Sequence, residues 1–154
     1  MRFIRPLLLA CALAFALASC SSNTQTEATA PRLTDPAATA GPLVDRFFTL
    51  IEQKDVAGLQ PFLSPAFQVQ RADGTASAKT KYLTELPTIN TFDISDLVAS
   101  QAGPVLVVRY LATVEGLVNG KPYTPGPAPR LSVFAWNGSG WQLAAHANFN
   151  PLAG

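Results

Sequence analysis

The segment "RLSVFAWNGSGWQLAAHANF", residues 130–149, has the pattern of a β-hairpin. Two runs rich in aromatic and aliphatic residues flank "NGSG" at residues 137–140, which has the asparagine and glycine that tight turns between antiparallel strands require. Alternation along the second run puts His146 and Asn148 on one face and Phe149 on the other, in the apolar layer. We therefore predict that the sheet ends in this hairpin and that His146, the chain's only histidine, shares a face with Asn148.

The chain before this hairpin predicts helices first and strands afterwards. Apolar residues recur at helical spacing early in the chain, and the period changes to two from about residue 90. This order predicts an α+β fold, with N-terminal helices packed on a curved, mainly antiparallel β-sheet and a ligand cavity between the layers. The expected elements are helices at 39–55, 55–63 and 76–86, and strands at 66–70, 90–100, 103–116, 130–136 and 141–149. Thr39 is the expected N-cap of the first helix and Asp55 that of the second.

Between the strands at 103–116 and 130–136 lies a segment with four prolines, residues 118–129. Proline cannot donate to a strand ladder, so the segment predicts a rigid loop over one end of the sheet. Tyr123 in this loop either covers the mouth of the cavity or packs on the loop itself.

The first residues, "MRFIRPLLLACALAFALASC", have the features of a secretory signal. Arg2 and Arg5 precede an apolar run that is the length of a signal-peptide core and short for a membrane span. The run ends in "LASC", which resembles the lipobox of bacterial lipoproteins. That resemblance implies lipidation of Cys20 and attachment to a membrane through the lipid. The alternatives are an ordinary secretory signal cut nearby and a retained transmembrane anchor.

The expected organisation is a lipoprotein signal peptide at 1–19, the lipidated cysteine with a flexible tether at 20–40, and one domain at 41–154. The tether is rich in Ser, Thr and Ala and buries too little apolar surface to offset its ordering entropy. An ordered strap along the domain is the alternative. By analogy with lipoproteins, Ser21 after the cysteine favours the cell envelope, on the periplasmic side of the outer membrane in a Gram-negative host.

Composition excludes several function classes. Removing the two arginines of residues 1–19 from the 11 basic residues leaves nine basic against ten acidic residues. The domain therefore lacks the excess of positive charge that nucleic-acid binding requires. The two cysteines, Cys11 and Cys20, fall in the signal and at the lipid position, so neither a disulfide nor a thiol nucleophile is expected in the domain. Neither a metal nor a cofactor is expected.

The domain resembles the nuclear transport factor 2-like superfamily over residues 42–150. The resemblance is carried by "LVDRFFTLIEQKD", "VAGLQPFLSPAFQV", "VLVVRYLATVEG" and the closing hairpin. The superfamily includes ketosteroid isomerases, polyketide cyclases, epoxide hydrolases and the association domain of calcium/calmodulin-dependent kinase, so the resemblance implies architecture and leaves activity open. It also implies a possible homodimer through the outer sheet face, for which the expected row is Leu106, Val108, Tyr110, Ala112 and Val114.

The candidate ligand-binding residues are Arg109, His146 and Asn148. In kinase association domains, the positions that match Arg109 and Asn148 are pocket arginines, and this resemblance puts all three side chains on the cavity side. Arg109 suits an anionic or carbonyl-bearing ligand because its planar fork binds two oxygens. Alternatively Arg109 pairs with an acid, of which the nearest candidates are Asp93, Asp96 and Glu115, and His146 bonds backbone or water.

The sequence contains no complete catalytic set, so we interpret the domain as binding a small ligand or a protein partner without clear catalysis. The alternative is an isomerase, cyclase or hydrolase of the same superfamily, in which His146 or an aspartate such as Asp93 acts as general base. A third interpretation is an oligomerisation module that uses the outer face of the sheet.

Overall fold

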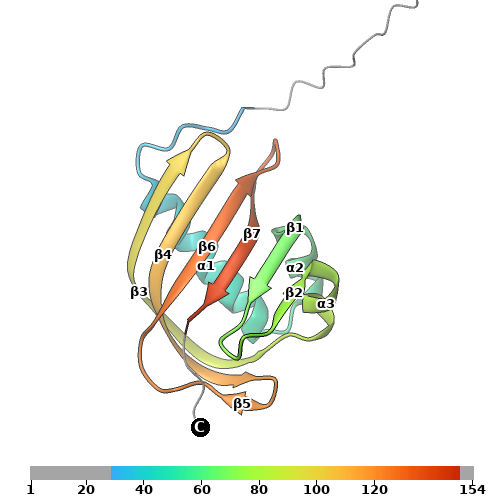
Figure 1. Cartoon of the computed structure of the whole chain (residues 1–154). Helices are drawn as coiled ribbons and strands as arrows, with labels where there is room; N and C mark the ends of the chain where they lie inside the picture. Colours follow the sequence, from blue (N-terminus) through green and yellow to red (C-terminus); the bar gives the residue numbers. More distant parts are fainter. Residues whose placement is uncertain (1–28, 150–154) are drawn as a thin grey trace, which may run out of the picture.

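The computed structural model describes residues 29–149, which form an α+β domain as predicted (Figure 1). The predicted signal peptide and Cys20 lie outside the described residues. The helices are α1 (Pro36–Glu52), α2 (Val56–Phe62) and α3 (Lys79–Thr84). The strands are β1 (Leu63–Gln70), β2 (Ala76–Ala78), β3 (Thr88–Ala102), β4 (Val105–Val118), β5 (Lys121–Pro122), β6 (Ala128–Trp136) and β7 (Trp141–Asn148).

Helix α1 begins earlier than the sequence pattern suggested. The carboxylate of Asp35, not the hydroxyl of Thr39, caps it by accepting from the N–H groups of Ala37 and Ala38 at 3.0 and 3.1 Å. Pro36 follows at the first helical position, where the missing N–H costs nothing. The cap of α2 is Asp55, as expected, which accepts from Gly58 N at 2.8 Å.

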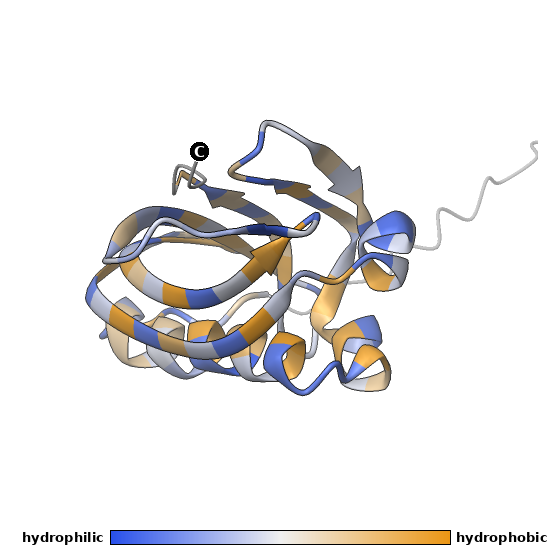
Figure 2. Cartoon of the chain, turned by 90° about the horizontal axis from the view of Figure 1, so that it is seen from below, coloured by the Kyte–Doolittle hydropathy of each residue, from blue (hydrophilic) through white to orange (hydrophobic). Residues whose placement is uncertain are grey.

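The strands form one mixed sheet in the order β2-β1-β7-β6-β4-β3, with β5 paired to β4. All neighbouring strands are antiparallel except β1 and β7, which are parallel. Helix α1 runs across one face of this sheet, and Figure 2 shows hydrophobic and hydrophilic bands alternating along the curved strands above it. The predicted closing hairpin is β6–β7, and Asn137 in its turn accepts from Ser139 N and Gly140 N at 3.0 and 2.9 Å.

Long strand β3 bends around the helix through two irregularities in its pairing with β4. The register shifts between Ile89 and Thr91 and again between Ser95 and Val98. Opposite the first shift stands Gly116, where an added Cβ would lie 2.0 Å from the carbonyl oxygen of Thr88. The backbones therefore approach at a distance that only glycine permits, and this helps to close the sheet around the core.

The row of β4 residues that we expected on the outer face lies in the core, so this expectation is wrong. Tyr110 is buried, and its ring lies 6.2 Å from that of Phe48 on α1. Both faces of β4 carry apolar residues, so their composition did not reveal which face the helix covers. The buried row is Leu106, Val108, Tyr110, Ala112 and Val114.

The end of the predicted tether is ordered. The side chain of Gln101 accepts from Leu33 N at 2.8 Å and donates to the carbonyl of Pro31 at 2.8 Å. Residues 31–33 therefore form a strap along the domain, and helix α1 starts within the range predicted as tether. No helix among residues 29–149 is long and apolar enough to cross a membrane.

Candidate functional site

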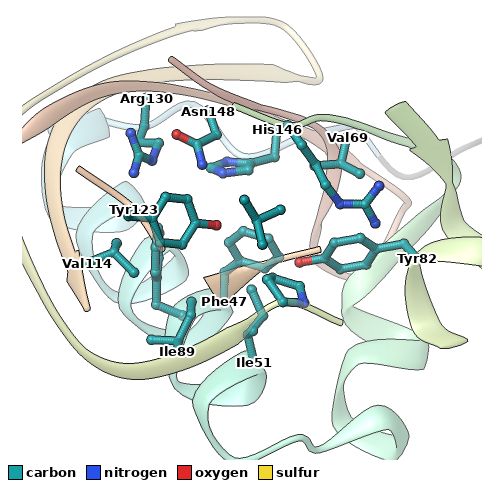
Figure 3. A pocket seen from close by; sticks show the side chains of 14 residues that line it. Phe47, Ile51, Val69, Tyr82, Ile89, Val114, Tyr123, Arg130, His146 and Asn148 are labelled. Atoms are coloured by element: carbon teal, nitrogen blue, oxygen red, sulfur yellow. The ribbon is translucent and has the colours of Figure 1, made fainter. Parts of the chain in front are cut away.

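A pocket lies between α1 and the concave face of the sheet (Figure 3). The space within it that the centre of a water-sized sphere can occupy is about 30 Å³, which is room for about two water molecules. The site is therefore small. Its lining residues are Phe47, Phe48, Ile51, Val69, Arg71, Tyr82, Pro87, Ile89, Val114, Val118, Tyr123, Arg130, His146 and Asn148.

The polar wall of the pocket comes from the closing hairpin. Arg130 on β6 is paired across the strands with Asn148 on β7, and Ser132 with His146. Directly opposite residues of antiparallel strands point to the same face, so these four side chains are turned toward the core. This pairing depends on a register shift between Val133 and Phe134, which leaves Ala144 as an extra residue on β7.

Arg130 carries a buried charge that the described residues do not neutralise. The residue is 2% exposed, and its Nη1 donates to the carbonyls of Ala128 and Pro129 at 3.3 and 3.0 Å. Its Nη2 is buried without a hydrogen-bond partner. Within the described part of the chain the salt bridge is Lys81–Glu85, so no carboxylate pairs with this guanidinium. Burial lowers the Arg130 pKa, while Tyr110 and Tyr123 oppose this effect.

His146 is held in a chain of buried hydrogen bonds. Its Nδ1 lies 3.1 Å from Ser132 Oγ, which in turn lies 3.1 Å from the hydroxyl of Tyr110. The imidazole also contacts the ring of Phe47 at a centroid distance of 5.0 Å. Burial, together with the positive charge of Arg130, lowers the His146 pKa to about 3. The imidazole is therefore neutral over the whole physiological pH range.

Tyr123, on the proline-rich loop, lines the pocket from the side of β4 and β5. Burial raises its pKa, and the charge of Arg130 and a side-chain hydrogen bond with Asn148 counteract this rise. Tyr123 therefore contacts the cavity and does not pack on the loop alone.

Two turns meet at the mouth of the pocket. Asn119 Nδ2, between β4 and β5, donates to Asp73 Oδ2 at 2.5 Å and to Thr75 Oγ1 at 3.3 Å in the turn after β1. Arg71 begins that second turn, and its guanidinium lies over the ring of Tyr82, with Cζ 5.7 Å from the ring centroid. Burial raises the Tyr82 pKa. The mouth is thus framed by contacts between residues far apart in sequence.

Two of the three predicted ligand-binding residues line the pocket, and one does not. His146 and Asn148 lie in the polar wall, whereas Arg109 is exposed on the opposite face of the sheet, between Val98 and Leu131. The expectation that Arg109 shares their face is therefore wrong. Nor does Arg109 form a salt bridge with any described acid, so its alternative pairing with Asp93, Asp96 or Glu115 is not found either.

The structure also locates two other residues from the sequence analysis, Asp93 and Phe149. Asp93, the second candidate for a general base, is exposed on β3 and does not line the pocket. Phe149, which was expected in the apolar layer, is 56% exposed. No group of three or more His, Cys, Asp or Glu side chains among residues 29–149 is arranged to hold a metal ion.

Sequence reasoning missed Arg130, Arg71 and Tyr82. Arg130 and Ser132 stand two residues apart at the start of an apolar strand, facing the strand that carries His146. That spacing was the available signal, because polar residues at alternate positions of one strand share a face. No sequence pattern pointed to Arg71, because its place in the pocket wall depends on the contact between the turn after β1 and Tyr82 on α3.

Comparison with known proteins supports the fold. No profile of a known protein family matches the chain, and no curated protein matches it. A nuclear transport factor 2-like protein from Cytophaga hutchinsonii has a TM-score of 0.66 and 14% identity, over 75% of this chain and 97% of that one. A nuclear transport factor 2-like protein of unknown function in nutrient uptake from Rhodospirillum rubrum has a TM-score of 0.61 and 21% identity, over 73% and 97%. The calcium/calmodulin-dependent kinase II hub homology domain from Chlamydomonas reinhardtii has a TM-score of 0.58 and 17% identity, over 78% of this chain and 99% of that one.

The domain therefore has the nuclear transport factor 2-like fold, as the resemblance implied. At these identities the likeness establishes architecture, and the function has to be argued from the pocket itself.

Proposed function

We propose that this domain binds a small anionic or carbonyl-bearing molecule in the pocket, without catalysing a reaction. The observation that carries the proposal is Arg130, a guanidinium that is 2% exposed, has no carboxylate partner in the described chain, and leaves Nη2 without a hydrogen bond. A buried and unpaired charge destabilises a fold. A ligand oxygen that accepts a hydrogen bond from Nη2 would offset this destabilisation, so the arginine is suited to binding an anion.

The surrounding groups are suited to the same ligand. The amide of Asn148 and the phenol of Tyr123 stand beside Arg130, and each can donate a hydrogen bond to an oxygen atom. The lining contains no Asp or Glu, so nothing in the wall repels a negative charge. Hydrogen bonds to an ionised partner are the stronger ones, which favours a carboxylate over a neutral carbonyl.

The geometry favours binding over the alternative of an isomerase, cyclase or hydrolase. An efficient general base has a pKa near the working pH, and the His146 pKa of about 3 makes its imidazole a weak base. Asp93, the other candidate base, lies outside the pocket. Turnover of a steroid-like or polyketide-like substrate that is lost on His146→Gln would overturn the non-catalytic proposal.

The binding proposal is tested with two matched arginine variants. Arg130→Met removes the charge in the pocket, and Arg109→Met removes one on the opposite face. Small carboxylates and carbonyl compounds should raise the thermal unfolding midpoint of the wild type and of Arg109→Met, and leave that of Arg130→Met unchanged. A panel in which no compound shifts the wild-type midpoint would remove the proposal.

We also propose that the protein is anchored in the cell envelope by lipid on Cys20, on the periplasmic side of the outer membrane if the host is Gram-negative. The support is the "LASC" sequence after an apolar run. Labelling with radioactive palmitate should mark the wild type and leave Cys20→Ala unmarked. Label on Cys20→Ala, or an unlabelled wild type, would contradict the anchor.

A homodimer remains a second proposal, on different residues from those first expected. The outer face of the sheet exposes Val98 and Leu131, which flank Arg109 on β3 and β6, and Val105 further along β4. Apolar side chains grouped on an uncovered sheet face are typical of association surfaces. Sedimentation should show a dimer that Leu131→Glu dissociates, whereas a wild type that stays monomeric at all concentrations would exclude it.

A further inference from the structure

We infer that the ligand of this pocket is a short monocarboxylic acid with an unsubstituted apolar body, and that the matching α-amino acid is excluded. The inference rests on the proposed binding function and narrows it to one chemical class. It follows from three properties of the pocket: the sign of its charges, the separation of its polar and apolar walls, and its size.

The charges select an anion and reject a zwitterion. The lining includes two cationic side chains, Arg130 and Arg71, and no carboxylate. Asp73, the acid in the turn after β1, is half-buried and is already engaged by Thr75 and Asn119. The ammonium group of an amino acid would therefore enter without a partner, close to two positive charges. Burial of a charge without an oppositely charged partner is strongly unfavourable, so the ammonium group opposes binding.

The walls of the pocket orient the carboxylate. In Figure 3, Arg130, Asn148 and His146 lie along one side, and Phe47, Ile51 and Ile89 lie on the other. The carboxylate on Arg130 therefore leaves the rest of the ligand against α1 and β3, where the side chains are apolar. Val114 and Val118 extend this apolar wall along β4. A hydroxyl at the far end of the ligand body would lose its bonds to water there and gain none from these apolar side chains, so acids with a terminal hydroxyl are disfavoured as well.

The size of the pocket limits the apolar body. Its open space of about 30 Å³ is room for about two water molecules, so only the shortest apolar bodies enter with small movements of the lining side chains. Acids with larger bodies require the mouth to widen, and the hydrogen bonds of Asn119 to Asp73 and Thr75 hold its two turns together. Butyrate is a suitable probe, because its amino, hydroxy and amide analogues each differ from it by one functional group.

The experiment compares butyrate with 2-aminobutyrate, 4-hydroxybutyrate, butyramide and inorganic phosphate on the full-length chain. Because the chain has one histidine, the imidazole NMR signals report on the pocket without assignment of other residues. Butyrate should shift the His146 signals in a saturable manner, with an affinity at least about tenfold higher than that of 2-aminobutyrate or 4-hydroxybutyrate. Arg109→Met should bind butyrate normally and Arg130→Met should not. Arg130→Lys keeps the charge without the planar fork and should bind butyrate more weakly.

The outcomes separate the inference from the proposed function. If 2-aminobutyrate binds as tightly as butyrate, or if butyramide or phosphate binds and butyrate does not, the monocarboxylate inference is overturned and binding at Arg130 stands. If none of the five compounds shifts the His146 signals, both are overturned. Unchanged near-ultraviolet circular dichroism of Arg130→Met and Arg130→Lys shows that a loss of binding is not a loss of folding.

Discussion

Arg130 and Asn148 are direct cross-strand partners on β6 and β7, and both side chains lie in the wall of the pocket. The pairing places a permanently charged donor beside an amide on a buried face, where water does not screen the charge. The fold therefore sustains an unfavourable arrangement at one position, which is typical of a site that a ligand completes.

Replacement of Arg130 by methionine should stabilise the ligand-free protein. The long apolar side chain fills a similar volume and removes a buried charge without a carboxylate partner. We expect the free energy of unfolding in urea to rise by about 1 kcal/mol, while binding is lost. Arg109→Met, on the exposed face, should change it by less than about 0.5 kcal/mol. A large loss of stability in Arg130→Met would mean that the bonds of Nη1 to Ala128 and Pro129 outweigh the buried charge.

Acid should destabilise the domain through His146. The folded-state pKa is about 3 and the ordinary value is 6.5, so below 6.5 the unfolded chain binds a proton that the folded chain does not. Stability from this residue is therefore complete above pH 6.5 and falls as the pH decreases toward 3, by at most about 1.4 kcal/mol per pH unit. Urea unfolding of the wild type and of His146→Gln between about pH 7 and about pH 5 should show the steeper decline in the wild type. NMR signals of His146 that titrate near pH 6.5 would refute the prediction.

Loss of the Ser132 hydroxyl should destabilise the core. Ser132→Ala leaves both the Tyr110 hydroxyl and His146 Nδ1 without their 3.1 Å partner in a buried environment. The expected cost is about 1–3 kcal/mol, measured by chemical denaturation. Ser95→Ala, on the exposed side of β3, should have almost no effect. An equally small effect for Ser132→Ala would indicate that water takes the place of the hydroxyl.

Two glycine variants should act in opposite directions. In Gly116→Ala the new Cβ meets the backbone carbonyl of Thr88, which cannot move without disrupting β3, so we expect a loss of about 2 kcal/mol or more. In Gly41→Ala no atom lies within 4 Å of the new Cβ, and alanine is the better helix former, so α1 should gain about 0.5–1 kcal/mol. Thermal unfolding midpoints of the two variants measure both effects, and shifts of the same sign would contradict this account.

Local signals were enough to predict the architecture. The α+β class, the closing hairpin across residues 137–140 and the cap at Asp55 follow from periodicity and turn residues, and each is found in the structure. The start of α1 was misplaced because two residues, Asp35 and Thr39, offer capping oxygens and only the packing of the first turn selects between them. His146 and Asn148 were placed together correctly, since positions two apart on a strand share a face.

The order of helices and strands, the hairpin and the pair His146–Asn148 could be predicted from local patterns, because these features depend on neighbours along the chain. Long-range packing selects which arginine enters the pocket. Both faces of β4 are apolar, so the packing of α1 on the side of Tyr110 is what turns Arg109 outward. The extra residue at Ala144 then sets the register of β7, and without it Arg130 would stand opposite Ala147 instead of Asn148. The position of this bulge depends on how β7 pairs with β1 on one side and β6 on the other, so no local pattern in the sequence predicts it.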